Sequence, residues 1–570
     1  MGNFIKTQNS FAAGEISKEF YAINNSNGVS KLENMDVLQS GAIKRRSGLK
    51  SIKSISSDSI LIPFVINEDE KYLLIVSERF IDIYKNDTKI TAVVVPWLSA
   101  DLSKLQYVQR FNSVYFVHPD YMPVILNKNG NDFSVSYFNF HVNDDMSINI
   151  PFIKFDDAKN VTITITSSTS GNNYATFTTN VDFWTNDNVG ETLFVNNKQW
   201  IVSSVSNARV ATVRTNGDFS LPNSPITDWY EAAFSNKRGW PISVSFHQNR
   251  LIFGGTKSKP NGIWMSKIGD YNNFDFGTGL DDEAIYTELL SEQHHQISTL
   301  VSSDKLQVLT SAGEWGISNS PLTPSEINIK QHTNIGSFTI RYLPPQQIEG
   351  RTVFISKSGK DIRELDLDVL GENYNATDLS VFSKHLMKNP VSIAFNQSQY
   401  KLFVVMEDGY IAVLHLYLNT EISAWGTYKT DGYFKYVCVL GNDTYVIVKR
   451  QGTCFLEKFD DTCLNDAEQY GFSYTVSSLP MITNNHFPKK IRLRKISVRL
   501  QNTKTLFVNN YRMEIPNDAY MENSGGFSGD LSMNLFGTQN DTMQPLWVLS
   551  SSEQLPTTVL SVNIDGFYII

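Results

Sequence analysis

Hydrophobic and polar residues alternate in short runs along most of this chain, whereas long runs with helical periodicity are scarce. The segment 243–255 has the clearest pattern, because apolar and polar positions alternate on both sides of the polar residues 247–250. A period of two is typical of a strand with one buried face. The segment therefore predicts two antiparallel strands joined by a short turn, and Gly254 and Gly255 end the second strand.

Hairpins of this kind recur along the chain and start near seven positions: Ile60, Leu105, Ser243, Ile297, Thr352, Ser392 and Tyr436. Successive starts lie about 40 to 55 residues apart, except for an interval of about 138 residues between the second and the third. A repeat of about 40 to 50 residues is typical of a four-stranded propeller blade. We therefore expect a mainly β protein with a β-propeller-like platform, in which the long interval holds an insertion. A series of unrelated β-meanders is the alternative, because the repeats share pattern and spacing but little sequence.

Changes in this pattern divide the chain into five predicted regions. Residues 1–58 are polar and rich in Asn, Ser and Gly, which favours an N-terminal docking arm that contributes little to a core. Residues 59–155 and 236–462 hold the two parts of the propeller-like platform. Residues 156–235 contain short alternating strands and are expected to form a small inserted β domain. The spacing changes again in residues 463–570, where we expect a separate C-terminal β-sandwich or barrel.

Composition and charge limit the possible functions. The chain has 570 residues, of which 49 are basic and 58 acidic, so its formal net charge is −9. This balance excludes a general nucleic-acid coating protein, which needs a basic surface to displace counterions from phosphate, but it does not exclude a protein that DNA passes. The longest apolar runs, such as Ala92–Pro96, are too short to span a bilayer, and the N-terminus has no hydrophobic signal core. We expect a soluble protein, made without secretion and without stable membrane association.

The sequence offers only weak candidates for catalysis or metal binding. His294 and His295 lie beside Glu292, but adjacent side chains of a strand point to opposite faces and do not converge on one ligand. The acidic residues 281–283 are neighbours in sequence, which is typical of a solvated face and not of a hydrolytic carboxylate pair. The sequence contains no phosphate-binding loop, nucleophile elbow or zinc motif. We therefore expect no enzymatic activity, no cofactor and no metal.

Nine short segments, spread in order over nearly the whole chain, carry a resemblance to one known family. They are Phe11–Ser17 (FAAGEIS), Leu32–Asn34 (LEN), Gly41–Gly48 (GAIKRRSG), Tyr115–Pro119 (YFVHP), Gly239–Gly255, Ser311–Trp315 (SAGEW), Thr377–Ser380 (TDLS), Lys384–Leu386 (KHL) and Ala424–Trp425. In this order they resemble the tail nozzle proteins of short-tailed bacteriophages, also called tail tubular protein B or stabilization proteins. The segments 156–235 and 463–570 resemble the family least.

The resemblance implies a structural virion protein that forms a hexameric ring below the portal and the adaptor, closes the tail and conducts the genome during ejection. It implies contacts with the adaptor ring and with tail fibre or needle proteins, and the transient passage of duplex DNA. The expected location is the virion tail, after assembly in the host cytoplasm. A propeller-based tail module that binds a glycan or a receptor is the alternative, and a polysaccharide-cleaving tail enzyme is a third hypothesis.

The first candidate contact site lies in the N-terminal region. Gly14 allows a tight bend before Glu15, as a threaded arm that adds to a neighbour's sheet would require. The basic residues Lys44, Arg45 and Arg46 are then available to pair with acidic groups of the adaptor or of a neighbouring subunit. An ordinary solvated charge cluster is the alternative for these three residues.

The second candidate contact site lies in the C-terminal region, in the strand-like stretch 489–500. Lys490, Arg492 and Arg494 fall on one face of this stretch by period-two alternation. They are candidates for contact with passing DNA or with another subunit. A solvated outer face of a sheet is the alternative.

Overall fold

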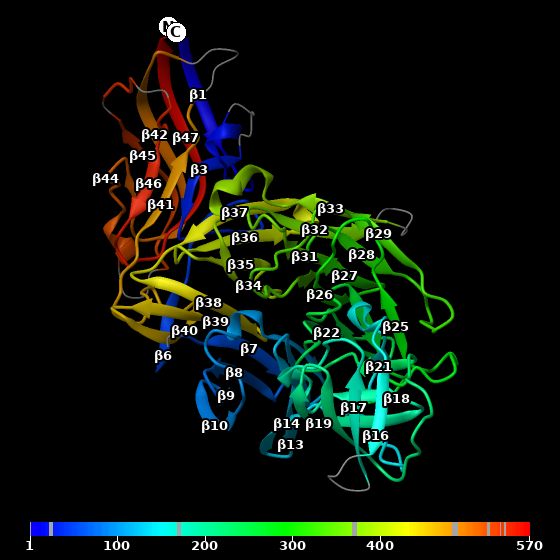
Figure 1. Cartoon of the computed structure of the whole chain (residues 1–570). Coiled ribbons are helices and arrows are strands. Elements are labelled where there is room, and N and C mark those ends of the chain that lie inside the picture. The colour runs from blue at the N-terminus through cyan, green and yellow to red at the C-terminus, as the bar shows by residue number, and fades with distance from the viewer. Residues whose placement is uncertain are drawn as a thin grey trace. The chain divides into compact units, whose positions relative to one another are not determined.

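The computed structural model describes residues 2–21, 27–56, 58–167, 173–367, 373–481, 488–520, 525–535, 537–540 and 543–569. Contacts within the chain divide it into two compact units (Figure 1). Unit 1 consists of Met1–Ala92 and Leu343–Ile570, and unit 2 consists of Val93–Tyr342. Both units are built from β-strands, and short 3-10 helices occur in the connections: η1 (Lys18–Phe20), η2 (Leu102–Lys104), η3 (Asp156–Ala158), η4 (Asn186–Asn188), η5 (Val381–Leu386), η6 (Leu418–Thr420) and η7 (Asn517–Tyr520).

Four groups of four antiparallel strands in unit 1 have the form of propeller blades; the last strand of the first group crosses the boundary of the unit. The first two groups are β7 (Ile60–Val65), β8 (Lys71–Ser77), β9 (Phe80–Lys85) and β10 (Thr88–Val94), then β30 (Gln346–Ile348), β31 (Arg351–Ile355), β32 (Ile362–Leu367) and β33 (Tyr374–Asp378). The third is β34 (Pro390–Asn396), β35 (Lys401–Met406), β36 (Ile411–Tyr417) and β37 (Ile422–Tyr428). The fourth is β38 (Tyr433–Leu440), β39 (Asp443–Arg450), β40 (Thr453–Asp460) and β6 (Gly48–Ile55).

Unit 2 contains three further sheets of the same form and one larger sheet. The four-stranded sheets are β11 (Gln106–Arg110), β12 (Ser113–His118), β13 (Tyr121–Asn129) and β14 (Asp132–Tyr137); β22 (Ser243–His247), β23 (Arg250–Gly254), β24 (Gly262–Met265) and β25 (Ile285–Glu288); and β26 (Ile297–Ser302), β27 (Leu306–Thr310), β28 (Glu314–Ile317) and β29 (Ile329–Thr333). The larger sheet is the inserted domain, with β15 (Phe152–Ile153), β16 (Ile163–Ser167), β17 (Tyr174–Thr179), β18 (Thr192–Val195), β19 (Lys198–Asn207), β20 (Val210–Thr215) and β21 (Trp229–Ala232).

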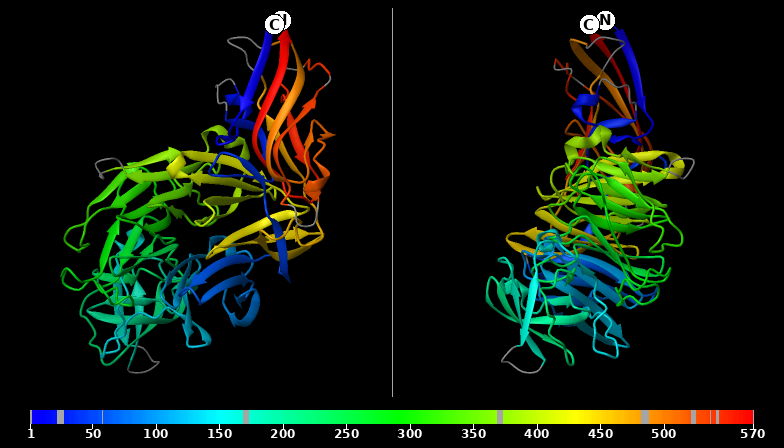
Figure 2. Two further views of the ribbon diagram at one scale, coloured as in Figure 1. Left: turned by 180° about the vertical axis from the view of Figure 1, so that it is seen from behind. Right: turned by 45° about the vertical axis from the view of Figure 1, so that its right-hand side comes forward.

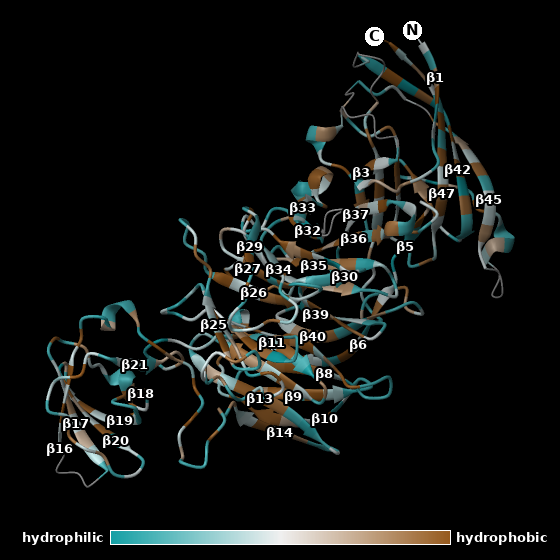
Figure 3. Cartoon of the chain, turned by 90° about the vertical axis from the view of Figure 1, so that its right-hand side faces the viewer, coloured by the Kyte–Doolittle hydropathy of each residue, from teal (hydrophilic) through white to brown (hydrophobic). Residues whose placement is uncertain are grey.

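The residue pattern explains the strand order within a blade. The second strand of the first blade, β8, is an almost continuous apolar run with buried residues on both faces. Its outermost strand, β10, alternates between exposed and half-buried positions, as expected for a strand at the edge of a sheet. Figure 3 shows the same distribution along the chain. Hydrophobic residues concentrate in the strands, and hydrophilic residues occur in many of the loops.

The fold class predicted from the sequence is confirmed, and each of the seven predicted hairpin starts lies in a strand of one of these sheets or directly before one. Two details differ. The unit expected to start near Thr352 begins one strand earlier, with β30, and the unit expected near Tyr436 supplies only three of its four strands. The fourth strand is β6, which pairs with β40 from Gly48 opposite Asp460 to Ile55 opposite Cys454. This pairing joins residues about 400 positions apart, so no local repeat could indicate it.

The interpretation of residues 1–58 as an arm outside the core is wrong. These residues and the C-terminal region together form a β-sandwich in unit 1. One sheet contains β4 (Met35–Val37), β5 (Ile43–Arg45), β47 (Thr558–Ile569), β42 (Lys490–Thr503), β45 (Phe527–Asn534) and β1 (Gly2–Gln8), which pairs with β47. The other continues from β37 through β2 (Gly14–Glu15), β3 (Gly28–Glu33), β41 (Tyr474–Ser478), β46 (Val548–Ser551), β43 (Phe507–Val508) and β44 (Tyr511–Arg512).

The sandwich core explains why the N-terminal residues are ordered in this way. Apolar residues from both ends of the chain are buried in one cluster, among them Phe11, Val29, Leu32, Met35, Ile496, Val562 and Ile564. Both views of Figure 2 show the two termini side by side, in agreement with the pairing of β1 and β47. Deleting residues 1–48 would therefore remove five strands and expose part of this core. Within the described residues, none of the helices combines the length and the apolar character needed to cross a lipid bilayer.

Candidate functional site

Segments that carry the resemblance meet around Gly14 and Glu15 in unit 1, and we call this group of contacts the motif junction. Gly14 pairs in parallel with Trp425 of β37 on one side and with Gly28 of β3 on the other. Its φ is +63°, and a Cβ atom at this position would lie 2.4 Å from the backbone nitrogen of Trp425. Gly14 is therefore required both by its left-handed backbone and by the close approach of β37.

The Glu15 carboxylate joins the N-terminal strand to two other elements. Its Oε2 accepts a hydrogen bond of 2.8 Å from the backbone N–H of Leu32, and its Oε1 lies 2.9 Å from Nε2 of His385. The backbone carbonyl of Glu15 accepts a hydrogen bond of 2.6 Å from the hydroxyl of Ser383 in η5. The indole N–H of Trp425 donates to the carbonyl of Leu379 at 2.8 Å. The segments 11–17, 377–380, 384–386 and 424–425 thus form one connected group.

A cavity of about 500 Å³ lies beside the motif junction. Its lining includes Ala12, Asp378, Phe382, Glu421 and Trp425. Phe382 is 40% exposed, so the cavity has an apolar rim with acidic groups beside it. Asp378 is already engaged, because it lies 3.0 Å from the ammonium group of Lys384.

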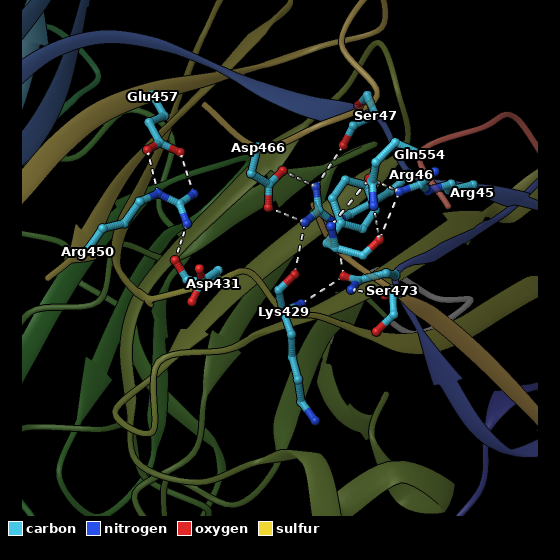
Figure 4. Close-up of polar contacts among 12 residues, drawn as sticks. Arg45, Arg46, Ser47, Lys429, Asp431, Arg450, Glu457, Asp466, Ser473 and Gln554 are labelled. Carbon is cyan, nitrogen blue, oxygen red and sulfur yellow. Dashed lines mark hydrogen bonds and ion pairs between the residues drawn. The ribbon is translucent and has the colours of Figure 1, made fainter. Parts of the chain in front are cut away.

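Arg46 is buried in unit 1 and fully occupied by partners from the same chain (Figure 4). Its guanidinium makes a bidentate contact with the buried carboxylate of Asp466, at 2.8 and 3.0 Å. It also donates to the carbonyls of Ser47 and Lys429 at 2.8 and 2.9 Å and to Oδ1 of Asn34 at 2.9 Å. Burying an ion pair has a desolvation cost. That cost is best offset when the contact is bidentate and every N–H group of the guanidinium has an acceptor, as is the case for Arg46.

Arg45 is buried as well, on the inward side of β5. It donates to the carbonyls of Phe472 and Glu553 at 2.9 and 2.8 Å and to the side chain of Gln554. Burial, together with the adjacent charge of Arg46, lowers the pKa of Arg45 to about 10. The expectation that Arg45 and Arg46 form an exposed docking cluster is therefore wrong. Lys44 alternates with Arg45 on β5 and is exposed, so it alone of the three basic residues is accessible to a partner.

Lys490, Arg492 and Arg494 lie on the exposed face of β42, as period-two alternation predicts, and Ile491 and Leu493 point into the core. Their proposed contact with DNA or a subunit stays a prediction. Arg494 is partly neutralised, since its guanidinium lies 2.7 Å from the carboxylate of Asp565.

The weak catalytic candidates have structural partners. His295 is buried and lies 2.8 Å from the hydroxyl of Thr310 through Nδ1. Glu283 accepts hydrogen bonds from the backbone N–H groups of three consecutive loop residues, Thr278, Gly279 and Leu280, and these bonds lower its pKa. The carboxylate therefore fixes a loop. In the part of the chain that the structure describes, no group of three or more potential metal ligands converges.

Sequence reasoning missed a buried pair of carboxylates at the base of the inserted domain. Glu231 is held by Arg238 at 2.5 and 3.0 Å, and Arg238 also makes a bidentate contact with Asp157 at 2.9 Å. Glu191 instead lies between the side chains of Asn188 and Ser235, at 2.5 and 3.2 Å. Burial, and then the neighbouring charge of Glu231, raises the pKa of Glu191 to about 8. The two residues are forty positions apart in sequence, so no motif indicated the pair.

Comparison with known proteins finds matches among solved structures only. No protein-family profile and no curated protein matches the sequence. Among solved structures, the chain is similar to the C-terminal WD40 domain of Sif2, at 14% identity and a TM-score of 0.35, covering 73% of this chain and 99% of that chain. It is similar to BBS1N, solved in complex with ARL6DN and soaked with mercury, at 8% identity and a TM-score of 0.31, with the same coverage of 73% and 99%. The β-propeller character of the fold follows from the four-stranded antiparallel sheets themselves.

Proposed function

We propose that this chain is a structural subunit of the tail nozzle of a short-tailed bacteriophage. In this role it forms a hexameric ring below the portal and the adaptor, closes the tail and conducts the genome during ejection. The observation that carries the proposal is the motif junction. Phe11–Ser17 lies hundreds of residues before Thr377–Ser380, Lys384–Leu386 and Ala424–Trp425, yet these segments, all of which suggested the family from sequence, are in direct contact.

The adjoining segments extend the same group. Asn34, of the segment LEN, accepts hydrogen bonds from Arg46, of the segment GAIKRRSG, and from the backbone N–H of Lys429, close to Trp425. A family whose members share these segments would share one structural joint between the N-terminal residues, a blade and the terminal sandwich. Such a joint suits a protein that works through shape and stiffness and not through a reaction.

The chemistry of the surface is compatible with a conduit. Each ion pair between a DNA phosphate and a Lys or Arg side chain would slow a passing genome. We expect few such ion pairs in a ring of chains that each carry a net charge of −9. We expect the adaptor ring and tail fibre or needle proteins as partners, and the virion tail as the location.

Immunogold electron microscopy of purified particles tests the proposal. Antibodies raised against this chain should label the end of the tail, at one site per particle. Particles made without the chain should contain a portal and an adaptor but should lose their packaged DNA. Labelling of the head, absence of label from particles, or DNA-retaining tails without the chain would contradict the proposal.

A further inference from the structure

The sheet of the inserted domain has an aromatic face that is not part of its core. One face packs into the buried cluster of unit 2, through residues that include Ile153, Leu193, Val195 and Trp229. The opposite face carries Phe152, Phe194 and Tyr230, each half-buried. Phe194 is directly opposite Tyr230, and Phe152 is opposite Ala232, two residues after Tyr230. Residues that are paired across antiparallel strands share a face, so three neighbouring strands place three aromatic rings side by side.

A cavity of about 700 Å³ lies over this aromatic face. Its lining includes Phe152, Phe194 and Tyr230 from the sheet, and Phe276, Asn143 and residues 145–150 from the connections. The ring centroids of Phe152 and Phe194 are 5.6 Å apart with the planes tilted by 40°, so the two rings are in contact on this face. The volume falls within the range of about 300 to 1,000 Å³ that small-molecule sites occupy.

The wall of this cavity is held in place before any ligand binds. The amide of Gln199 accepts a hydrogen bond of 2.8 Å from the backbone N–H of Ile148 and donates one of 2.9 Å to its carbonyl. Asn143 donates to Oδ1 of Asn149 at 2.6 Å, and Asn216 donates to the carbonyl of Met146 at 3.1 Å. These contacts fix the segment 143–150 against the sheet, so a ligand would find a preorganised site.

The polar groups of the cavity indicate which ligand class it suits. Amides line it at Asn143, Asn149, Asn197 and Gln199, and carboxylates at Asp145 and Asp275. Among the described lining residues, Lys198 carries the only positive charge, and its ammonium donates to the backbone carbonyl of Asp218. A phosphate or sulfate group would therefore meet acidic side chains and an engaged lysine. Hydroxyl groups, in contrast, can donate to carboxylates and exchange hydrogen bonds with amides.

We propose that this cavity is a binding site for a neutral saccharide, with the apolar C–H face of a sugar ring against Phe152, Phe194 and Tyr230. Asn197 and the carboxylates of Asp145 and Asp275, which line the same cavity, bind the hydroxyl groups at its edge. All residues that line the site lie in unit 2. The saccharide proposal is argued from these residues alone, so it does not rest on the proposed nozzle function. A nucleobase would also stack on these rings, but its attached phosphates fit the acidic rim poorly.

Saturation-transfer NMR with the full-length protein tests the site. The probes are methyl glucopyranoside, methyl galactopyranoside, methyl rhamnopyranoside and N-acetylglucosamine, each at about 10 mM, a concentration that detects millimolar affinities. At least one probe should receive saturation on its ring protons. Phe194→Ala and Tyr230→Ala should weaken that binding at least about tenfold. Tyr511→Ala, which removes a 68% exposed aromatic side chain in unit 1, should leave it unchanged.

Three results would overturn the saccharide site: no transfer to any of the four probes, equal binding by the cavity variants, or competition by inorganic phosphate or a short oligonucleotide. Near-ultraviolet circular dichroism checks the fold of each variant. If an alanine variant does not fold, Phe194→Leu removes the ring but keeps apolar volume, and it should lose binding by the same criterion. Retained binding by a folded Phe194→Leu variant would contradict the role of the ring.

Discussion

Two basic stretches of unit 1 look alike in sequence but have opposite environments. Arg45 and Arg46 are 3% and 1% exposed and are used entirely within the chain, whereas Lys490, Arg492 and Arg494 lie on the outer face of β42. The difference comes from residues that are remote in sequence. Arg46 is buried because Asp466 and the carbonyl of Lys429 compensate its charge, while the neighbours of β42 leave its outer face in water.

The comparison shows that a cluster of charge in a β protein has no fixed meaning until its pairing partners are known. Alternation correctly separates Lys44 from Arg45 and Lys490 from Ile491, because period two is a local property of a strand. It does not reveal which face the rest of the chain covers. In this protein the covered face of β5 contains arginine, and the covered face of β42 contains isoleucine and leucine.

The largest effect is expected from removing the buried cation. Arg46→Met leaves the carboxylate of Asp466 buried without its bidentate partner, which should lower the free energy of unfolding of unit 1 by about 3 to 5 kcal/mol. Urea denaturation of the full chain measures the loss. The double variant Arg46→Met with Asp466→Leu should recover most of it, and Lys44→Met should change stability by less than about 0.5 kcal/mol. An effect of Arg46→Met as small as that of Lys44→Met would show that the buried pair does not stabilise the fold.

The motif junction gives the next largest effect. Gly14→Ala combines a φ of +63° with a Cβ atom 2.4 Å from the backbone of Trp425, and should destabilise by about 2 to 3 kcal/mol. Gly130→Ala is the matched control, because its φ is +59° and no atom lies within 4 Å of the added carbon. Gly130→Ala should lower the free energy of unfolding by about 1 kcal/mol, because it introduces backbone strain but no steric clash. If thermal denaturation showed the same loss of stability for Gly14→Ala and Gly130→Ala, β37 would have moved to make room for the added Cβ atom. The motif junction would then not be tightly packed.

Glu191 tests the contrasting case of a buried carboxyl group that lacks a bidentate arginine. Its pKa of about 8 in the folded state lies above the ordinary glutamate value of 4.5, so unfolding releases its proton between these two pH values. This contribution to stability therefore decreases as pH rises from about 4.5 to about 8. Glu191→Gln should remove that dependence and stabilise the protein relative to the unmodified chain, most strongly at pH 8 and above. Parallel stability–pH curves for both proteins would show that Glu191 is ionised in the folded state.

The smallest effect is expected on the exposed basic face. Replacing Lys490, Arg492 and Arg494 together with Gln should change the free energy of unfolding by less than about 1 kcal/mol, because surface ion pairs contribute little. Assembly into particles should be nearly unchanged. Fluorescence anisotropy should show weak, salt-sensitive binding of duplex DNA by the assembled ring, and weaker binding by the variant. Submicromolar binding that persists at physiological salt would indicate a site that grips DNA.

The sequence predicted the local parts of the fold well and the long-range parts poorly. The blades follow from hairpins within about 50 residues, so their starts at Ile60, Ser243 and Ile297 were identified correctly. The pairings of β1 with β47 and of β6 with β40 join strands hundreds of residues apart, and no periodicity encodes them. The same limit applies to sites. Glu15 was identified from its motif, but its partner His385 and the aromatic cavity of the inserted domain depend on pairings that only the folded chain reveals.

The copy number of this chain in a particle tests the nozzle proposal most directly. Native mass spectrometry of tails released from purified particles should find six copies of the 64.4 kDa chain, the number that the family resemblance implies, in a closed ring with cyclic symmetry. A monomeric state of the isolated chain is compatible with the proposal, because ring closure can depend on the adaptor. A single copy per tail, in particles that retain their genome, would contradict the proposal that this protein forms the wall of the conduit.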